Sequence, residues 1–304
     1  MPVNSDSMAH NSIGTFIKTT FSIVLLFIFC STALSAQERF DLQRQGGHYY
    51  FTSSINDIPV EIMLESGIPA LLVGQSVYEA CLQSDGLTFQ PSSQKIRLLN
   101  RLYDILCKAD GEIMIGGVIY DGPVFVLKDY DGASVPVQYL KDPASKRAVL
   151  AIDLKNNYMQ VGGVEKIPGG RKFRLSFDES LGFPLVAASA RLITHEGRSK
   201  LKGRLIVDFG NPSLLFLRKQ HKSIGQAIEK GTIKLRDAYD KKGNLVAQGI
   251  YADQVSLFGQ KYHDVSIGVT DKMQSLSHMG FLGIPFFSSP VVFDFDRGYM
   301  MVSR

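Results

Sequence analysis

Two stretches of the chain repeat one another without a gap, and each is an apolar strand that ends in a carboxylate. Residues 62–73 align with residues 205–216, which places Glu65 opposite Asp208. In both copies the acid is followed by one variable residue, a glycine, a turn and another apolar run. The repeat predicts two related units that each contribute one acid. A facing pair of carboxyls can share one proton and activate water.

Three further matches keep the same order along the chain. Residues 120–126 resemble 262–268, residues 149–152 resemble 281–284, and residues 158–161 resemble 299–302. Duplication of one β-rich unit explains why both the order and the approximate spacing are kept. The alternative is that two unrelated β-rich segments share the hydrophobic alternation that any sheet requires.

The N-terminal segment differs from the rest of the chain. An apolar run over residues 21–29 follows Lys18 and precedes small residues up to Ala36. The run is shorter than the roughly 20 apolar residues of a membrane span. It predicts a signal peptide and an exported protein that is periplasmic, cell-surface or secreted. The alternative is an uncleaved N-terminal anchor, and we expect membrane contact only through this segment.

Composition and charge restrict the expected partners. The formal net charge is +4, from Lys and Arg residues that are scattered along the sequence. No basic run interleaves with aromatic residues, so we expect no nucleic acid partner. The His residues lack metal-ligand spacing, and we expect neither a metal nor another cofactor. Cys81 and Cys107 can form a disulfide in an exported protein, or they can be two separate buried thiols.

Strand-like periodicity dominates the chain, with short helices expected only at residues 75–82 and 223–230. In the second half, residues 183–194 and 204–207 are predicted strands that flank a polar loop, residues 195–202. The expected class is therefore all-β.

Two pairs of glycines, at positions 162–163 and 169–170, mark a linker near the middle of the chain. We therefore divide the sequence into four parts. These are a signal peptide (1–36), an N-terminal lobe (37–163), a linker (164–171) and a C-terminal lobe (172–304).

The chain resembles the bilobal aspartic proteases of the pepsin and retropepsin type. In that family each lobe has a hydrophobic strand followed by Asp-Thr-Gly or Asp-Ser-Gly, and later a hydrophobic-hydrophobic-Gly segment that threads behind the catalytic loop. The segments Glu65-Ser66-Gly67 and Asp208-Phe209-Gly210 are similar to the first motif, and residues 281–284 are similar to the second. Residues 291–302 are similar to the terminal hairpin of the family.

The resemblance implies a fold of two related acid-protease-like lobes, each a β-barrel-like domain, with a cleft between them. It implies that Asp208 and Glu65 are the catalytic acids and hydrolyse peptide bonds through a bound water. The residues that would support them are Ser66, Gly67, Phe209, Gly210 and Gly283. The substrate or ligand would be an extended peptide or a protein, bound by a monomer. Tyr103 would lie on a flap over the cleft, unless it is a plain strand tyrosine.

Three positions depart from the family pattern. Glu65 replaces an aspartate, Phe209 replaces a residue with a hydroxyl, and Ala151 stands at the position matched to Gly283. These departures leave a second hypothesis open, that of a catalytically impaired relative that binds peptides or a protein partner in the groove. A different β-rich fold, or a structural envelope module without a groove ligand, is a third possibility.

Overall fold

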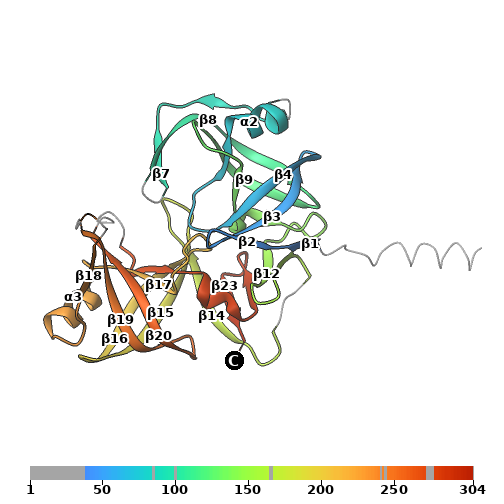
Figure 1. Ribbon diagram of the computed structural model, residues 1–304. Coiled ribbons are helices and arrows are strands. Elements are labelled where there is room, and N and C mark those ends of the chain that lie inside the picture. The colour runs from blue at the N-terminus through green and yellow to red at the C-terminus, as the bar shows by residue number, and fades with distance from the viewer. Residues whose placement is uncertain are drawn as a thin grey trace, which may run out of the picture. The chain divides into compact units, whose positions relative to one another are not determined.

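The computed structural model describes residues 38–83, 86–98, 101–163, 167–239, 242, 245–271 and 277–303, without the side chain of residue 246. The predicted signal peptide and residues 164–166 of the predicted linker lie outside this part of the chain. The described chain is almost entirely β-structure, arranged in two large sheets (Figure 1). It contains no helix with the length and apolar character that crossing a membrane requires.

One sheet consists of ten strands from the N-terminal half of the described chain. They are β2 (Gln43–Gln45), β3 (His48–Ile55), β4 (Ile58–Glu65), β5 (Leu71–Gly74), β6 (Gln90–Pro91), β7 (Lys95–Leu98), β8 (Arg101–Ile115), β9 (Val118–Leu127), β10 (Ala133–Pro136) and β11 (Leu140–Lys141). The turn between β3 and β4 has positive φ at both Asn56 and Asp57, as a two-residue hairpin turn requires.

The other sheet has thirteen strands among the described residues. They are β1 (Glu38–Asp41), β12 (Val149–Asp153), β13 (Tyr158–Val161), β14 (Arg171–Phe177), β15 (Pro184–Thr194), β16 (Gly197–Val207), β17 (Leu215–Arg218), β18 (Arg236–Tyr239), β19 (Leu245–Leu257), β20 (Gln260–Thr270), β21 (Gly280–Leu282), β22 (Val291–Asp294) and β23 (Tyr299–Val302). Strands β1, β12 and β13 of the N-terminal half therefore share a sheet with strands of the C-terminal half.

Helices are short and few in the described chain. The predicted segment at 75–82 forms one turn of α-helix, α2 (Gln75–Val77), that continues as a π-helix, η1 (Tyr78–Leu82). The second predicted helix is confirmed as α3 (Lys222–Glu229). Two 3₁₀ turns, η2 (Val137–Tyr139) and η3 (Ile284–Ser288), follow strands β10 and β21.

The pairing of strands repeats between the two halves. Strand β4 pairs in parallel with β10, which pairs antiparallel with β5, which pairs in parallel with β9. Strand β16 pairs in parallel with β21, which pairs antiparallel with β17, which pairs in parallel with β20. The sequence repeat thus coincides with a repeat of topology.

This topology corrects one of the predicted sequence matches. Residues 149–152 do not correspond to residues 281–284, because the counterpart of β21 is β10. In the register, Val135 lies opposite Leu64 as Leu282 lies opposite Val207, so Pro136 occupies the place of Gly283. Apolar tetrapeptides carry too little pattern to distinguish neighbouring buried strands.

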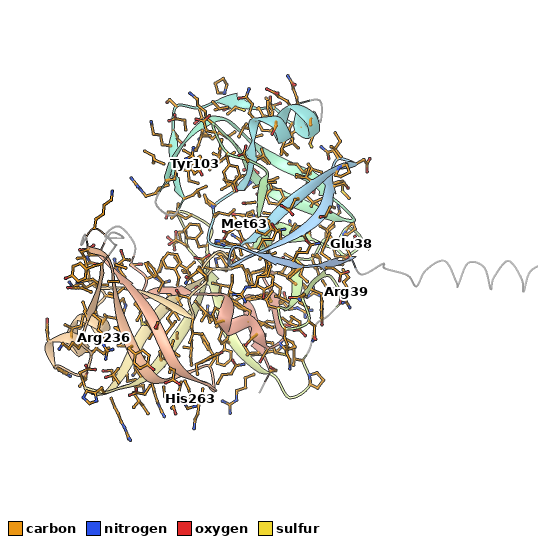
Figure 2. The ribbon with its side chains drawn as sticks, in the orientation of Figure 1. Glu38, Arg39, Met63, Tyr103, Arg236 and His263 are labelled. Carbon is orange, nitrogen blue, oxygen red and sulfur yellow. The ribbon has the colours of Figure 1, made fainter. Side chains whose placement is uncertain are left out.

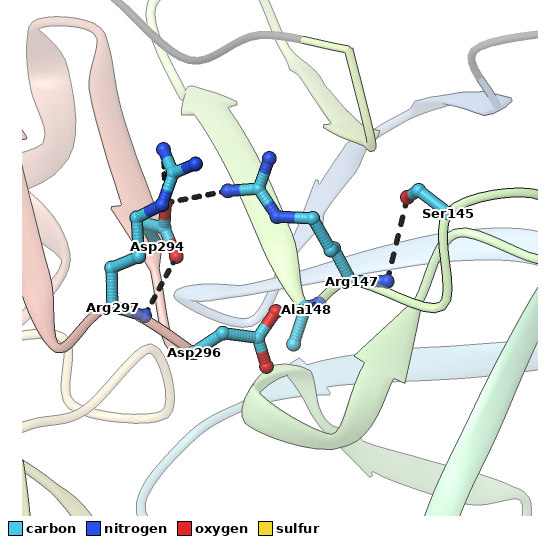
Figure 3. A network of polar contacts seen from close by, with 6 residues as sticks. All are labelled: Ser145, Arg147, Ala148, Asp294, Asp296 and Arg297. Carbon is cyan, nitrogen blue, oxygen red and sulfur yellow. Dashed lines mark hydrogen bonds and ion pairs between the residues drawn. The ribbon is translucent and has the colours of Figure 1, made fainter.

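Residues 149–152 belong instead to β12, which pairs with β22 and β13 in the sheet shared by the two halves. Here Asp294 is fully buried, and its carboxylate accepts a hydrogen bond of 2.8 Å from Arg147 and one of 2.9 Å from the amide of Arg297. Asp296 accepts a hydrogen bond from the amide of Ala148 (Figure 3). These contacts join the closing hairpin to the N-terminal half, and the pairing satisfies the buried charge of Asp294.

The predicted polar loop at residues 195–202 is wrong. The turn is confined to His195 and Glu196, and β15 and β16 pair continuously from Thr194–Gly197 to Leu185–Ile206. The segment contains a charged residue at every second position, which a strand accommodates by pointing those residues to solvent.

Both cysteines of the described chain are free thiols. Cys81 is buried in η1, and Cys107 is half-buried on β8. Burial raises the pKa of each thiol. The disulfide that an exported chain allows is therefore not formed in this structure.

Candidate active site

The two acids of the sequence repeat stand at equivalent places in the fold. Glu65 is the last residue of β4, and Asp208 directly follows β16. The residue before each acid, Leu64 or Val207, is fully buried, and this burial fixes where the backbone turns. The structure brings the two predicted catalytic acids together: the side chain of Glu65 lowers the pKa of Asp208, and the charge of Asp208 raises the pKa of Glu65.

Each glycine of the two motifs lies against the acid of the other motif. A Cβ atom on Gly67 would lie 2.7 Å from Oδ1 of Asp208, and a Cβ atom on Gly210 would overlap the carboxyl oxygens of Glu65. Each turn therefore makes room for the acid of the other half. Neither glycine has a positive φ, so close approach rather than backbone conformation explains the residue type.

Glu65 is the buried member of the pair. Burial and the neighbouring charge of Asp208 raise the pKa of Glu65 well above its usual value. The nearby backbone amides of Ser66, Gly210 and Gly67 favour the ionised form of Glu65 and offset part of this rise in its pKa. Burial and the neighbouring charge therefore both favour the protonated form of Glu65.

Asp208 is the more accessible member, with a half-buried side chain. Burial raises the pKa of Asp208 to about 6. The amide of Gly210 and the side chain of Glu65 act in the opposite direction and offset part of this rise. The Gly210 amide donates to Oδ1 at 2.9 Å. The carboxylate form of Asp208 is therefore favoured above about pH 6, whereas the raised pKa of Glu65 favours its carboxylic acid form.

Ser66 is a hydrogen-bonded brace between the two turns. Its hydroxyl donates to the carbonyl oxygen of Val207 at 2.8 Å and accepts from the amide of Phe209 at 3.1 Å. The side chain is fully buried, so both bonds are shielded from water.

Phe209 has no hydroxyl with which to make the reciprocal bonds. Its ring points into the core, with 1% of its surface exposed, and packs 4.5 Å from Phe287 and 5.9 Å from Phe293 between ring centroids. Phe209 therefore packs behind the acids and does not block them. Aromatic packing holds the second turn in the place of a hydroxyl.

Gly283 lies directly behind the second turn. Its amide donates to Leu214, and a Cβ atom there would overlap the carbonyl oxygens of Asn211 and Ser213. The preceding carbonyl of Leu282 accepts from the amide of Asp208 at 2.9 Å. The first turn has Pro136 at this place, and Gln138 Nε2 lies 3.4 Å from the carbonyl oxygen of Ser66.

Two tyrosines near Glu65 escaped the sequence reasoning. The charge of Glu65 contributes to raising the pKa of both Tyr50 and Tyr130, for which burial is the larger cause, and that of Tyr130 reaches about 12. Tyr130 hydrogen-bonds Ser134, and its ring lies 5.5 Å from that of Tyr103 on β8 (Figure 2). No motif marks them, because Tyr50 on β3 and Tyr130 in the loop between β9 and β10 are far apart in the sequence.

The described residues contain no group of His, Cys, Asp and Glu that could hold a metal ion. What the pair can do on its own is exchange protons. The carboxylate of Asp208 can accept a proton from water, and the protonated Glu65 can donate one to a leaving or developing oxygen.

No protein-family profile and no curated protein matches the chain by sequence. Among solved structures, the chain is similar to an aspartic proteinase from Irpex lacteus, with a TM-score of 0.56 and 11% sequence identity. The match covers 88% of this chain and 97% of that one. At this identity the likeness concerns the fold, which is that of the aspartic proteases: all-β, with barrel-like sheets.

Proposed function

We propose that the protein is an exported aspartic-type endopeptidase that hydrolyses peptide bonds with Glu65 and Asp208. The observation that carries the proposal is the close pairing of the two carboxyl groups, each of which lies against the glycine of the other motif, Gly67 or Gly210. Two acids that share one proton can act as base and acid in the same step. The peptide would lie extended in the groove between two lobes.

In the proposed mechanism Asp208 is the general base. As the accessible, ionised partner it removes a proton from a water molecule that attacks the peptide carbonyl. Glu65 donates its proton to the carbonyl oxygen, and a tetrahedral intermediate forms. Collapse of this intermediate, with a proton passed from the pair to the leaving nitrogen, breaks the C–N bond and restores the starting state.

The pH dependence follows from the raised pKa values. The working form needs Asp208 ionised and Glu65 protonated. The pKa of Asp208 is about 6, so activity should rise as the pH passes through about 6. It should fall only above the higher pKa of Glu65. The predicted optimum therefore lies near neutral pH rather than in strong acid.

A second candidate is a peptide-binding relative without hydrolysis. The observation that favours it is the asymmetry of the site, with one hydroxyl brace at Ser66 and a packed ring at Phe209. Catalytic groups need placement to within about half an ångström. A site braced on one side could hold the acids too loosely for catalysis while still binding a peptide.

Hydrolysis of an unfolded protein by the chain without residues 1–36, measured from about pH 4 to pH 9, tests the proposal. We expect cleavage with a rising limb near pH 6, and a loss of about 10³-fold in Asp208→Asn. The matched control is Asp253→Asn, which removes an exposed acid on β19. Absence of cleavage across this range, with tight peptide binding retained in Asp208→Asn, would favour the second candidate.

A further inference from the structure

We infer that the outer face of β16 recognises an acidic segment of an extended peptide, on one side of the acid pair. The face consists of Arg198, Lys200, Lys202 and Arg204, joined by Arg191 from β15, and we name these five residues the basic track. The inference deepens the proposed function and rests on it for the placement of the peptide.

Strand geometry aligns the track with the acid. Side chains alternate between the two faces of a strand, so residues 198, 200, 202 and 204 share one face of β16 with Ile206. On this face Ile206 is fully buried in an apolar cluster with Phe183 and Leu185, so a covered stretch separates the track from Asp208, which follows just past the end of the strand. At about 3.3 Å per residue, Arg204 lies about 13 Å from Asp208 along the chain direction, which an extended peptide spans with about four residues.

All five cations are exposed, and the other face of β16 is covered. The neighbours Leu201 and Gly203 lie on the covered face, where Leu201 is fully buried and the Cα of Gly203 faces Met279 and His221. The cations therefore project outward because of the strand period.

The charges of the track are not neutralised within the described chain. No carboxylate of the described residues forms an ion pair with any of the five. Elsewhere the protein pairs exposed cations on its strands, as in Lys95 with Asp104 at 2.8 Å. In the track, Lys200 lies directly opposite Arg191, a cross-strand pair of like charges that destabilises a sheet. An anionic ligand would relieve this repulsion.

A surface hollow adjoins the end of the track nearest the acids. Its volume is about 550 Å³, and its lining combines Lys202 and Arg204 of the track with Gly203 and His221 of the covered face. Burial lowers the pKa of His221, so its ring is neutral at neutral pH. Lys202 and Arg204 are therefore the members of the track that adjoin the hollow.

The spacing of the charges favours a peptide over other polyanions. Alternate residues of the track are about 7 Å apart, which is also the repeat of alternate side chains on an extended peptide. The residues of the track include no aromatic side chain on which a nucleobase could stack, as single-stranded nucleic acid sites require.

The equivalent face of the first half has the opposite character. On β4, Met63 and the exposed Glu61 lie on the same face as Glu65, at alternate positions before it in the sequence (Figure 2). Tyr50 of β3 lies opposite Met63. A peptide that crosses the acid pair would therefore meet an apolar and negative surface on one side and the basic track on the other. Acidic residues should be preferred on only one side of the cleaved bond.

Binding separates this inference from the proposed function. We would measure fluorescence anisotropy of a labelled ten-residue peptide with Glu at alternate positions, and of the same peptide with Gln, against Asp208→Asn, in which hydrolysis is blocked. We expect the Glu peptide to bind about tenfold more tightly at low salt and to lose this advantage as salt screens the charges. Equal binding of the two peptides would overturn the inference, whether or not the wild type hydrolyses peptides.

Variants locate the binding surface. Lys200→Gln with Lys202→Gln should reduce affinity for the Glu peptide about fivefold or more and leave the Gln peptide unaffected. The matched control is Lys155→Gln with Lys234→Gln, which removes two exposed cations outside the track. Equal affinities in both double variants would contradict the assignment. So would tighter track-dependent binding of oligothymidine or of vesicles containing phosphatidylglycerol.

Discussion

The two turns that present the acids have the same topology but are held by different forces. The first turn has a short polar residue, Ser66, whose hydroxyl reaches across to Val207 and Phe209. The second has Phe209, whose ring packs away from the first turn against Phe287. One brace is directional and weak, whereas the other is non-directional and strong. The pair of acids can thus be kept together without symmetry.

The same contrast holds for the acids themselves. Glu65 has one methylene more than Asp208 and reaches across to the amide of Gly210 in the other turn. Glu65 is buried, which favours its protonated form, whereas Asp208 is half-buried and has a pKa of about 6. In a symmetric pair the two roles would be interchangeable, whereas here the surroundings assign them.

The largest effect on stability should come from the packed brace. Phe209→Ala removes a ring that is 1% exposed, and we expect the free energy of unfolding to fall by about 3–5 kcal/mol. Phe177→Ala, at a phenylalanine that is 39% exposed, is the control and should change it by less than about 0.5 kcal/mol. Denaturant unfolding measures both. A small loss in Phe209→Ala would show that the ring does not hold the second turn.

The glycines of the two motifs allow a sharper test of the asymmetry. A methyl group at Gly210 would overlap the carboxyl of Glu65, so Gly210→Ala should cost about 3 kcal/mol. In a Glu65→Ala background the overlap is gone, and most of the cost should vanish. A double-mutant cycle measures this coupling. Additive effects of the two substitutions would mean that the two groups do not touch.

Stability should depend on pH through the acid pair. A carboxyl group whose pKa is raised by folding stabilises the folded state below its unfolded pKa, near 4, and loses this contribution as pH rises through the folded pKa. For Asp208 that folded value is about 6. Relative to Glu65→Gln with Asp208→Asn, the wild type should lose about 2 kcal/mol between pH 4 and pH 8. Parallel stability curves for the two proteins would contradict the raised pKa values.

The hydrogen-bonded brace should have the smallest effect. Ser66→Ala leaves the buried amide of Phe209 without its acceptor, and we expect a loss of about 1 kcal/mol in the free energy of unfolding. Ser66→Thr keeps the hydroxyl and serves as the control. If Ser66→Ala cost as much as Phe209→Ala, the contrast between the two braces would be wrong.

Much of the fold could be predicted from the sequence because its strongest signal is long and gap-free. The repeat around Glu65 and Asp208 spans two strands and a turn, and its pairing partners repeat as well. Shorter matches failed where several buried strands look alike. Residues 149–152 were matched to the wrong strand because burial on both faces removes the alternation that would identify them.

The sequence predicted the acids and glycines of the candidate site but not the residues that surround them. Tyr50 and Tyr130 are influenced by the charge of Glu65 through tertiary folding, which no local sequence pattern encodes. The basic track had a signal, since cations occupy every second position from Arg198 to Arg204. That alternation was obscured because the segment was assigned to a polar loop instead of a strand.

The central claim is that Glu65 holds a proton shared with Asp208. The most direct measurement is ¹³C NMR of the side-chain carboxyl groups of glutamate-labelled protein, titrated over pH, with Glu65 assigned from the signal missing in Glu65→Gln. We predict that Glu65 titrates well above its usual range and shifts to lower pH in Asp208→Asn, where the neighbouring charge is absent. A Glu65 that titrates near 4.3, the usual value for glutamate, in both proteins would contradict the account.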